Sequence, residues 1–142
     1  LSINCDFDQV IRCCATVPRK EGEGTWITEE MIRAYQLLHR RGYAHSVECW
    51  EGSRLAGGLY GIGLGKVFFG ESMFSIVPNS SKFALIHLVD FLISIDYRLI
   101  DCQMTTNHLV SMGAREISGS EFRRLLGTYI TTHTENGAWP HG

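Results

Sequence analysis

Two carboxylates and one amide stand inside otherwise apolar, strand-like segments of this 142-residue chain. Glu71 lies within Phe68–Ser75, and Asp101 and Gln103 follow further along the chain. A carboxylate that is buried without a partner costs several kcal/mol, so its presence in such a segment needs a reason. Asp101 and Gln103 are two positions apart on a predicted strand and therefore share one face. A carboxylate beside an amide can orient an amine and polarise a carbonyl group.

The alternative to a functional role is that each of these side chains is simply exposed to solvent. Strict alternation places Phe69, Glu71 and Met73 on one face of the predicted strand, and exposed strand glutamates are common. The two apolar neighbours favour an apolar cleft instead, where the carboxylate could hold an ammonium group or a ribose hydroxyl. Asp101 and Gln103 could likewise mark a strand end that reaches solvent. We interpret all three as candidate site residues.

Other patterns that often carry chemistry are weaker. The glycines of Gly61–Lys66 join two predicted strands, which favours a hairpin over a phosphate-binding loop. Pro78–Lys82 lacks the glycine pattern of an acetyl-CoA loop, which disfavours acetyl transfer. The six histidines show no metal-ligand spacing, so we expect no metal and no other cofactor. Cys102 and His108 could resemble a thiol nucleophile pair, but alternation predicts Cys102 in the core.

Composition limits the function classes. With 44% apolar and 20% charged residues, the chain is typical of one globular domain. The net charge of −2 and the lack of a basic block argue against extended nucleic-acid binding and leave binding to an RNA end possible. Five cysteines without C-x-x-C spacing indicate reduced thiols and a cytoplasmic location. The apolar runs are too short to span a membrane.

Hydrophobic periodicity predicts an antiparallel meander, then a long helix and another strand, which is an α+β layout. Thr28 is the predicted N-cap of a helix that stops near Gly42. The predicted helices span 7–15, 29–41, 80–95, 108–112 and 121–126, and the predicted strands span 1–4, 45–50, 55–62, 67–74, 98–103 and, at an edge, 116–117.

Five motifs occur in the order known from one family: Gly24–Thr28, Ala44–Glu48, Gly57–Gly61, Phe68–Ser75 and Ile100–Gln103. On these motifs the chain resembles a leucyl/phenylalanyl-tRNA–protein transferase from about Trp26 to Phe122. The resemblance implies an N-acetyltransferase-like (GNAT-type) α+β fold, with a mixed sheet flanked by helices. It also implies a catalytic domain over 1–128 and an irregular tail over 129–142. We further expect that an N-terminal domain carried by family members is absent.

The resemblance also implies a reaction. Leu or Phe would move from the 3′ end of aminoacyl-tRNA to the α-amine of a protein that begins with Arg or Lys, and the new N-terminus would mark that protein for degradation. Asp101 and Gln103 would activate the attacking amine, Glu71 would belong to the same catalytic set, and Trp26 would stack on the terminal adenine. The pocket for the transferred side chain would be lined by Leu59, Phe68, Met73, Leu88 and Leu92. The ester is already activated, so no cofactor is required.

Departures from the family pattern keep other interpretations open. Gly119 stands where the family usually carries Arg. Leu88 and Leu92 stand at pocket positions where family members can carry aromatic residues. The preference of this chain for Leu or Phe as the transferred amino acid is therefore left open. One alternative is a truncated or inactive module that binds aminoacyl-tRNA or peptide without turnover. A second is an acyltransferase that uses another activated donor. We expect a monomer without membrane attachment.

Overall fold

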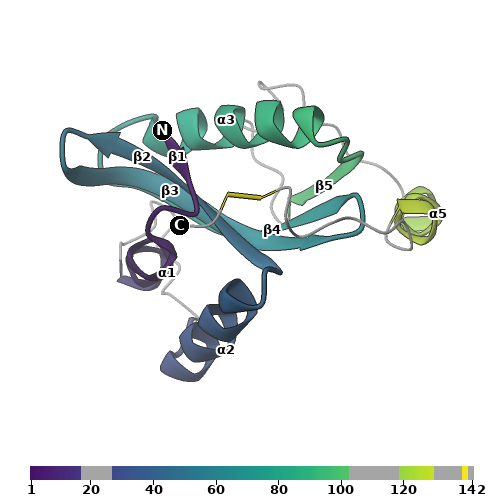
Figure 1. Cartoon of the computed structure of the whole chain (residues 1–142), viewed down its shortest axis with the longest axis horizontal. Helices are drawn as coiled ribbons and strands as arrows, with labels where there is room; N and C mark the ends of the chain where they lie inside the picture. Colours follow the sequence, from purple (N-terminus) through teal and green to yellow (C-terminus); the bar gives the residue numbers. More distant parts are fainter. Residues whose placement is uncertain (17–26, 103–118, 130–138, 141–142) are drawn as a thin grey trace.

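The computed structural model describes residues 1–16, 27–102, 119–129 and 139–140. These residues form an α+β structure in which helices cover both faces of one five-stranded sheet (Figure 1). The strand order is β1-β2-β3-β4-β5, so every strand lies beside its neighbour in the chain. The predicted α+β class and the mixed sheet flanked by helices are confirmed.

The strands are β1 (Ser2–Ile3), β2 (Ala44–Glu51), β3 (Arg54–Leu64), β4 (Val67–Ser75) and β5 (Leu99–Cys102). Neighbouring pairs are antiparallel from β1 to β4, whereas β5 runs parallel to β4. A parallel pair needs a long crossover, and here a helix supplies it. Tight turns with positive φ at Gly52 and Gly65 close the two hairpins. The glycines of Gly61–Lys66 thus belong to a hairpin, as predicted.

The helices are α1 (Phe7–Thr16), α2 (Glu29–Arg40), α3 (Ser80–Ser94) and α5 (Gly119–Tyr129). Thr28 caps α2 as predicted, because its hydroxyl accepts a hydrogen bond from the backbone N–H of Met31 at 3.2 Å. Asn79 occupies the N-cap position of α3 but makes no side-chain cap bond. The last helix is longer than the turn predicted over 121–126. The predicted elements over 108–112 and 116–117 lie outside the described residues.

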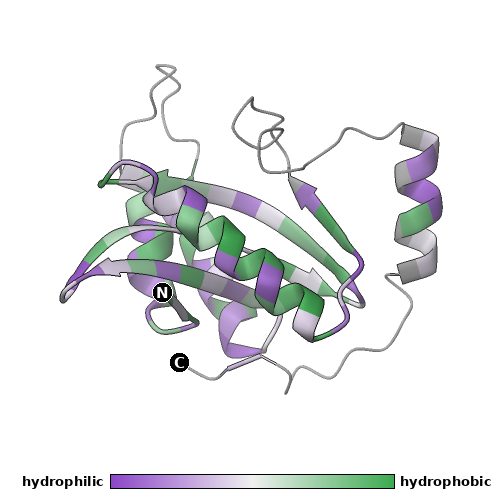
Figure 2. Cartoon of the chain, turned by 90° about the horizontal axis from the view of Figure 1, so that it is seen from above, coloured by the Kyte–Doolittle hydropathy of each residue, from purple (hydrophilic) through white to green (hydrophobic). Residues whose placement is uncertain are grey.

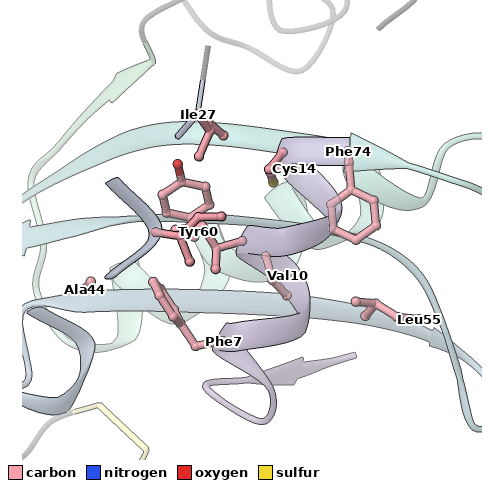
Figure 3. Packing of buried hydrophobic residues seen from close by; sticks show 11 residues of the cluster. Phe7, Val10, Cys14, Ile27, Ala44, Leu55, Tyr60 and Phe74 are labelled. Carbon is pink, nitrogen blue, oxygen red and sulfur yellow. The ribbon is translucent and has the colours of Figure 1, made fainter. Parts of the chain in front are cut away.

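Two apolar cores lie on opposite faces of the sheet. The first, the α1-side core, is shown in Figure 3 and comprises Phe7, Val10, Ile11, Cys14, Ala15, Ile27, Ile32, Ala44, Leu55, Tyr60 and Phe74. The second, the α3-side core, comprises Val47, Leu59, Phe68, Ala84, Leu85, Leu88, Leu92 and Trp139. Figure 2 shows α3 lying across the sheet with apolar residues along most of its length. The sheet is therefore covered on both faces.

A buried carboxylate ties β1 to β2. Glu48 is fully buried and accepts hydrogen bonds from the Ser2 hydroxyl at 2.6 Å and the Cys5 backbone N–H at 3.0 Å. The hydroxyl of Ser46 also donates to it. A buried carboxyl group is tolerated when its oxygen atoms accept hydrogen bonds in this way. The Ala44–Glu48 motif thus has a structural role.

A β-bulge interrupts the pairing of β3 with β4. Tyr60 is opposite Ser72 and Gly61 is opposite Gly70, so Glu71 is an additional residue in β4. An additional residue bends the strand and changes which face the following side chains occupy. Bulges are common next to active sites, where they redirect a side chain.

The bulge overturns one sequence prediction. Strict alternation placed Met73 on the face of Glu71 and placed Phe68 with Phe74 on the other face. Instead, Met73 and Phe68 both pack in the α3-side core, and Phe74 packs in the α1-side core. The prediction was wrong because Glu71 shifts the alternation by one position, which a period-of-two pattern cannot reveal.

Two glycines of β3 allow aromatic rings to lie directly on the strand. A Cβ atom at Gly61 would lie 2.2 Å from the Phe69 carbonyl oxygen and 2.6 Å from the Phe68 ring. A Cβ atom at Gly63 would lie 2.6 Å from the Tyr97 hydroxyl oxygen. The absence of side chains at both positions is therefore a requirement of packing.

We expect Gly61→Ala to lower the free energy of unfolding by about 1–3 kcal/mol, because the added methyl group overpacks a site bounded by backbone. Gly127→Ala is the matched control. Its Cβ atom would have no neighbour within 4 Å, and alanine in a helix is favoured over glycine by about 0.5–1 kcal/mol. Urea unfolding of both variants measures the difference. Equal stability of Gly61→Ala and the unaltered chain would contradict this packing argument.

Candidate active site

Glu71 and Asp101 lie on adjacent strands and on the same face of the sheet. Asp101 pairs in register with Phe69 of β4, and the bulge residue Glu71 follows two positions later. Ile100 packs in the α3-side core, so Asp101 projects from the opposite face. The negative charge of Asp101 acts on Glu71. The structure therefore brings the two predicted carboxylates together.

Tyr35 of α2 is the third member of this group. Its hydroxyl group is placed to donate a hydrogen bond to the Glu71 carboxylate. The Tyr35 ring packs edge-on against Tyr60, with 5.3 Å between ring centroids, which fixes it against the sheet. The sequence patterns do not single out Tyr35 as a site residue. No local pattern signals it, because two strands separate α2 from β4 along the chain.

The electrostatics of the group follow from partial burial. Burial raises the pKa of the Glu71 carboxyl, the Tyr35 hydroxyl opposes this shift, and the charge of Asp101 adds to it. Burial also raises the pKa of Asp101. Burial, followed by the charge of Glu71 and the hydrogen bond to it, raises the pKa of Tyr35 to about 12. Two neighbouring carboxylates of this kind form a ready site for a cationic group.

The five predicted pocket residues also come together, but on the other face of the sheet. Leu59, Phe68, Leu88 and Leu92 are buried in the α3-side core, and Met73 is partly buried beside them. The carboxylates face α2, whereas the apolar set faces α3. Gln103 and Trp26 lie outside the described residues.

Gly70 lies at the end of the pairing between β4 and β5. It is the last residue of β4 that pairs with β5, opposite Cys102. It has no side chain, and a Cβ atom there would lie 3.5 Å from its nearest neighbour, the carbonyl oxygen of Asp101. Glu71 follows directly on the α2 face. Glu71 and Asp101 therefore lie at this end of the β4–β5 pair on the α2 face, and Phe68, two positions before Gly70, packs on the α3 face.

Neither a metal site nor a membrane-spanning helix is found in the part of the chain that the structure describes. No group of three or more His, Cys, Asp or Glu side chains there could hold a metal ion. None of the described helices is long and apolar enough to cross a bilayer.

Comparison with known proteins identifies the family. The profile described as leucyl/phenylalanyl-tRNA protein transferase matches residues 1–127. A leucyl/phenylalanyl-tRNA–protein transferase of Syntrophotalea carbinolica is 54% identical over 137 residues, which is 94% of this chain and 60% of that protein. The protein of the same name from Thermodesulfovibrio yellowstonii is 50% identical over 139 residues, 98% of this chain and 57% of its own length. The chain belongs to the leucyl/phenylalanyl-tRNA–protein transferase family.

The chain spans about three fifths of the length of these curated relatives. Both sets of predicted site residues, the carboxylates and the apolar residues, fall within the matched region. The family resemblance stated from the sequence motifs is therefore confirmed.

The raised pKa of Glu71 predicts a pH-dependent effect of Glu71→Gln on stability. A carboxyl group whose pKa is raised by folding contributes stability below its ordinary value of 4.5, and that contribution is lost as the pH rises through the folded-state pKa. Glutamine keeps the shape but does not ionise. We expect the melting temperatures of Glu71→Gln and the unaltered chain to agree near pH 4, with the variant higher at pH 7.

Thermal unfolding at the two pH values measures this difference, and Glu51→Gln at an exposed strand end is the control. If Glu71→Gln were the less stable protein at pH 7, the carboxylate would be stabilised in the folded state and this electrostatic account would be wrong.

Proposed function

We propose that this chain transfers Leu or Phe from the 3′ end of aminoacyl-tRNA to the α-amine of a protein that begins with Arg or Lys. The observation that carries the proposal is the Glu71–Asp101 pair, which lies on the face of the sheet opposite the large apolar cluster of the α3-side core. Transfer from an ester to an amine needs such a combination, because one substrate is cationic and the other carries an apolar side chain. The family and the names of the relatives point to the same reaction.

The carboxylates serve the acceptor. Gln103 orients the α-amine through its amide group, and Asp101 accepts the amine proton as the nitrogen attacks the ester carbonyl. The C–O bond of the ester breaks as the C–N bond forms, and the ribose oxygen of the tRNA leaves as a hydroxyl group with that proton. Glu71 holds a neighbouring ammonium group or a ribose hydroxyl. Tyr35 orients Glu71 through its hydroxyl group. An acceptor with an N-terminal Arg or Lys adds a second cation, which a pair of carboxylates favours. The ester needs no further activation, so the main tasks are positioning and stabilisation of developing charge.

The apolar residues serve the donor. In this proposal the transferred side chain inserts between the sheet and α3, among Leu59, Phe68, Met73, Leu88 and Leu92. Trp26 stacks on the terminal adenine. The end of the β4–β5 pairing at Gly70 then lies beneath the ester, with the acceptor on the α2 face. A glycine there lets the ester pass close to the backbone.

The fold and the chain organisation fit the same proposal. A mixed sheet with a helix crossing between parallel strands β4 and β5 supports an N-acetyltransferase-like catalytic domain over residues 1–128, followed by a tail over 129–142. We infer that the chain acts as a monomer in the cytoplasm, where charged tRNA is made, and that the product is directed to degradation.

We expect Glu71→Gln, Asp101→Asn and Gln103→Ala each to lower transfer by about 10²–10³-fold, because each removes one preorganised polar contact. The assay measures labelling of an Arg-initiated peptide from radiolabelled Phe-tRNA, and Asp90→Asn on the exposed side of α3 is the control. Near-normal transfer by a folded Glu71 variant would contradict the assigned site. Binding of aminoacyl-adenosine without transfer by the unaltered chain would favour a binding module instead.

Recognition should be limited to the aminoacylated 3′ end. The chain has a net charge of −2 and no basic block, so it neutralises few phosphates. We expect the logarithm of the binding constant for a short aminoacylated RNA to fall with the logarithm of salt concentration by about 0.7 for each phosphate contacted. A total slope steeper than about −4 would indicate six or more contacts and would exclude this mode of recognition.

A further inference from the structure

Trp139 joins the α3-side core from the far end of the chain. Its side chain is 3% exposed and belongs to the same buried cluster as Leu59, Phe68, Leu88 and Leu92. The sequence predicts an irregular tail over 129–142 and no role for Trp139.

Four aromatic rings surround the indole ring of Trp139. It stacks on His45 of β2 with 3.8 Å between ring centroids and an interplanar angle of 4°. Its centroid lies 5.8 Å from that of Phe68 and 4.9 Å from that of Phe91 on α3. Tyr97, after α3, meets it edge-on at 5.9 Å. The indole ring therefore bridges β2, β4 and α3.

Polar contacts fix the position of the ring. The indole N–H donates a hydrogen bond to the Tyr97 hydroxyl at 3.2 Å. The side-chain amide of Asn4, which follows β1, donates to the carbonyl oxygen of Pro140 at 2.9 Å and also contacts the Nδ1 atom of His45 at 3.0 Å. Asn4 thus links the residue after Trp139 to the ring on which Trp139 stacks. Hydrogen bonds therefore hold both the indole ring, through Tyr97, and the backbone next to it, through Asn4.

We propose that Trp139 is the end wall of the pocket for the transferred side chain and sets the size of the side chain that the pocket accepts. The inference rests on the proposed function. Phe68 is the shared element, because it is a proposed pocket residue and contacts the Trp139 ring. A large, fixed aromatic wall limits the depth of a pocket, so replacing it with a small residue favours longer side chains. Trp139 acts here as a specificity-determining residue.

The first test compares kcat/KM for Leu-tRNA and Phe-tRNA in Trp139→Ala and Trp139→Phe. We expect the preference to move toward Phe by about tenfold or more in Trp139→Ala, because a change of pocket size by a few carbon atoms has effects of this order. Ile11→Ala is the matched control, since it removes a buried side chain from the opposite core. It should destabilise the fold and leave the Leu-to-Phe ratio unchanged. An unchanged ratio in folded Trp139 variants overturns the inference.

A second measurement does not depend on turnover or on the folding of Trp139→Ala. The chain has three tryptophans, and the Trp139 resonance can be assigned in 5-fluorotryptophan-labelled protein by comparison with Trp139→Phe. Stable amide-linked leucyl- and phenylalanyl-adenosine should shift this resonance, whereas the alanyl analogue should not. If the analogues bind without shifting the Trp139 resonance, the inference about Trp139 is overturned, whereas the proposed function is not. A lack of binding by all analogues overturns the proposed function and this inference with it.

Discussion

The additional residue in β4 determines which face of the sheet Glu71 and Met73 occupy. Because Glu71 has no partner in β3, the strand changes face between Phe68 and Phe74, and the carboxylate turns toward α2 while Met73 turns toward α3. Without the bulge, the side chains of β4 would continue to alternate and Met73 would lie beside the carboxylate. A local break in pairing thus separates polar from apolar groups across the thickness of one sheet.

The central strand makes this separation possible. β3 is buried on both faces for most of its length, and its glycines allow Phe68 and Tyr97 to lie against the backbone. The aromatic residues on the α3 side can then pack around one another, and Trp139 completes that layer. On the other side, Tyr60 supports Tyr35, which contacts Glu71. Packing in the α1-side core therefore controls the orientation of Tyr35 and, through it, of Glu71.

Different buried polar groups have different roles in this structure. Glu48 is fully buried with several donors, and it joins the edge strand β1 to the sheet. Glu71 is only partly buried, has Tyr35 as a donor and Asp101 as a like charge nearby, and its pKa is raised. A satisfied carboxylate stabilises a fold, whereas a carboxylate beside a like charge is suited to binding a cation. The motifs that indicated the family thus include both structural and candidate functional residues.

The sequence by itself determined the family, the α+β class and the main elements from Phe7 to Cys102, because motif order, hydrophobic period and turn residues are local properties. It also singled out Glu71 and Asp101, since charged residues in apolar strands are visible without a structure. The bulge, the contact of Tyr35 with Glu71 and the place of Trp139 in the α3-side core were decided by tertiary structure. Each depends on the register of strands or on segments far apart in the chain, and a local pattern contains no information on such contacts.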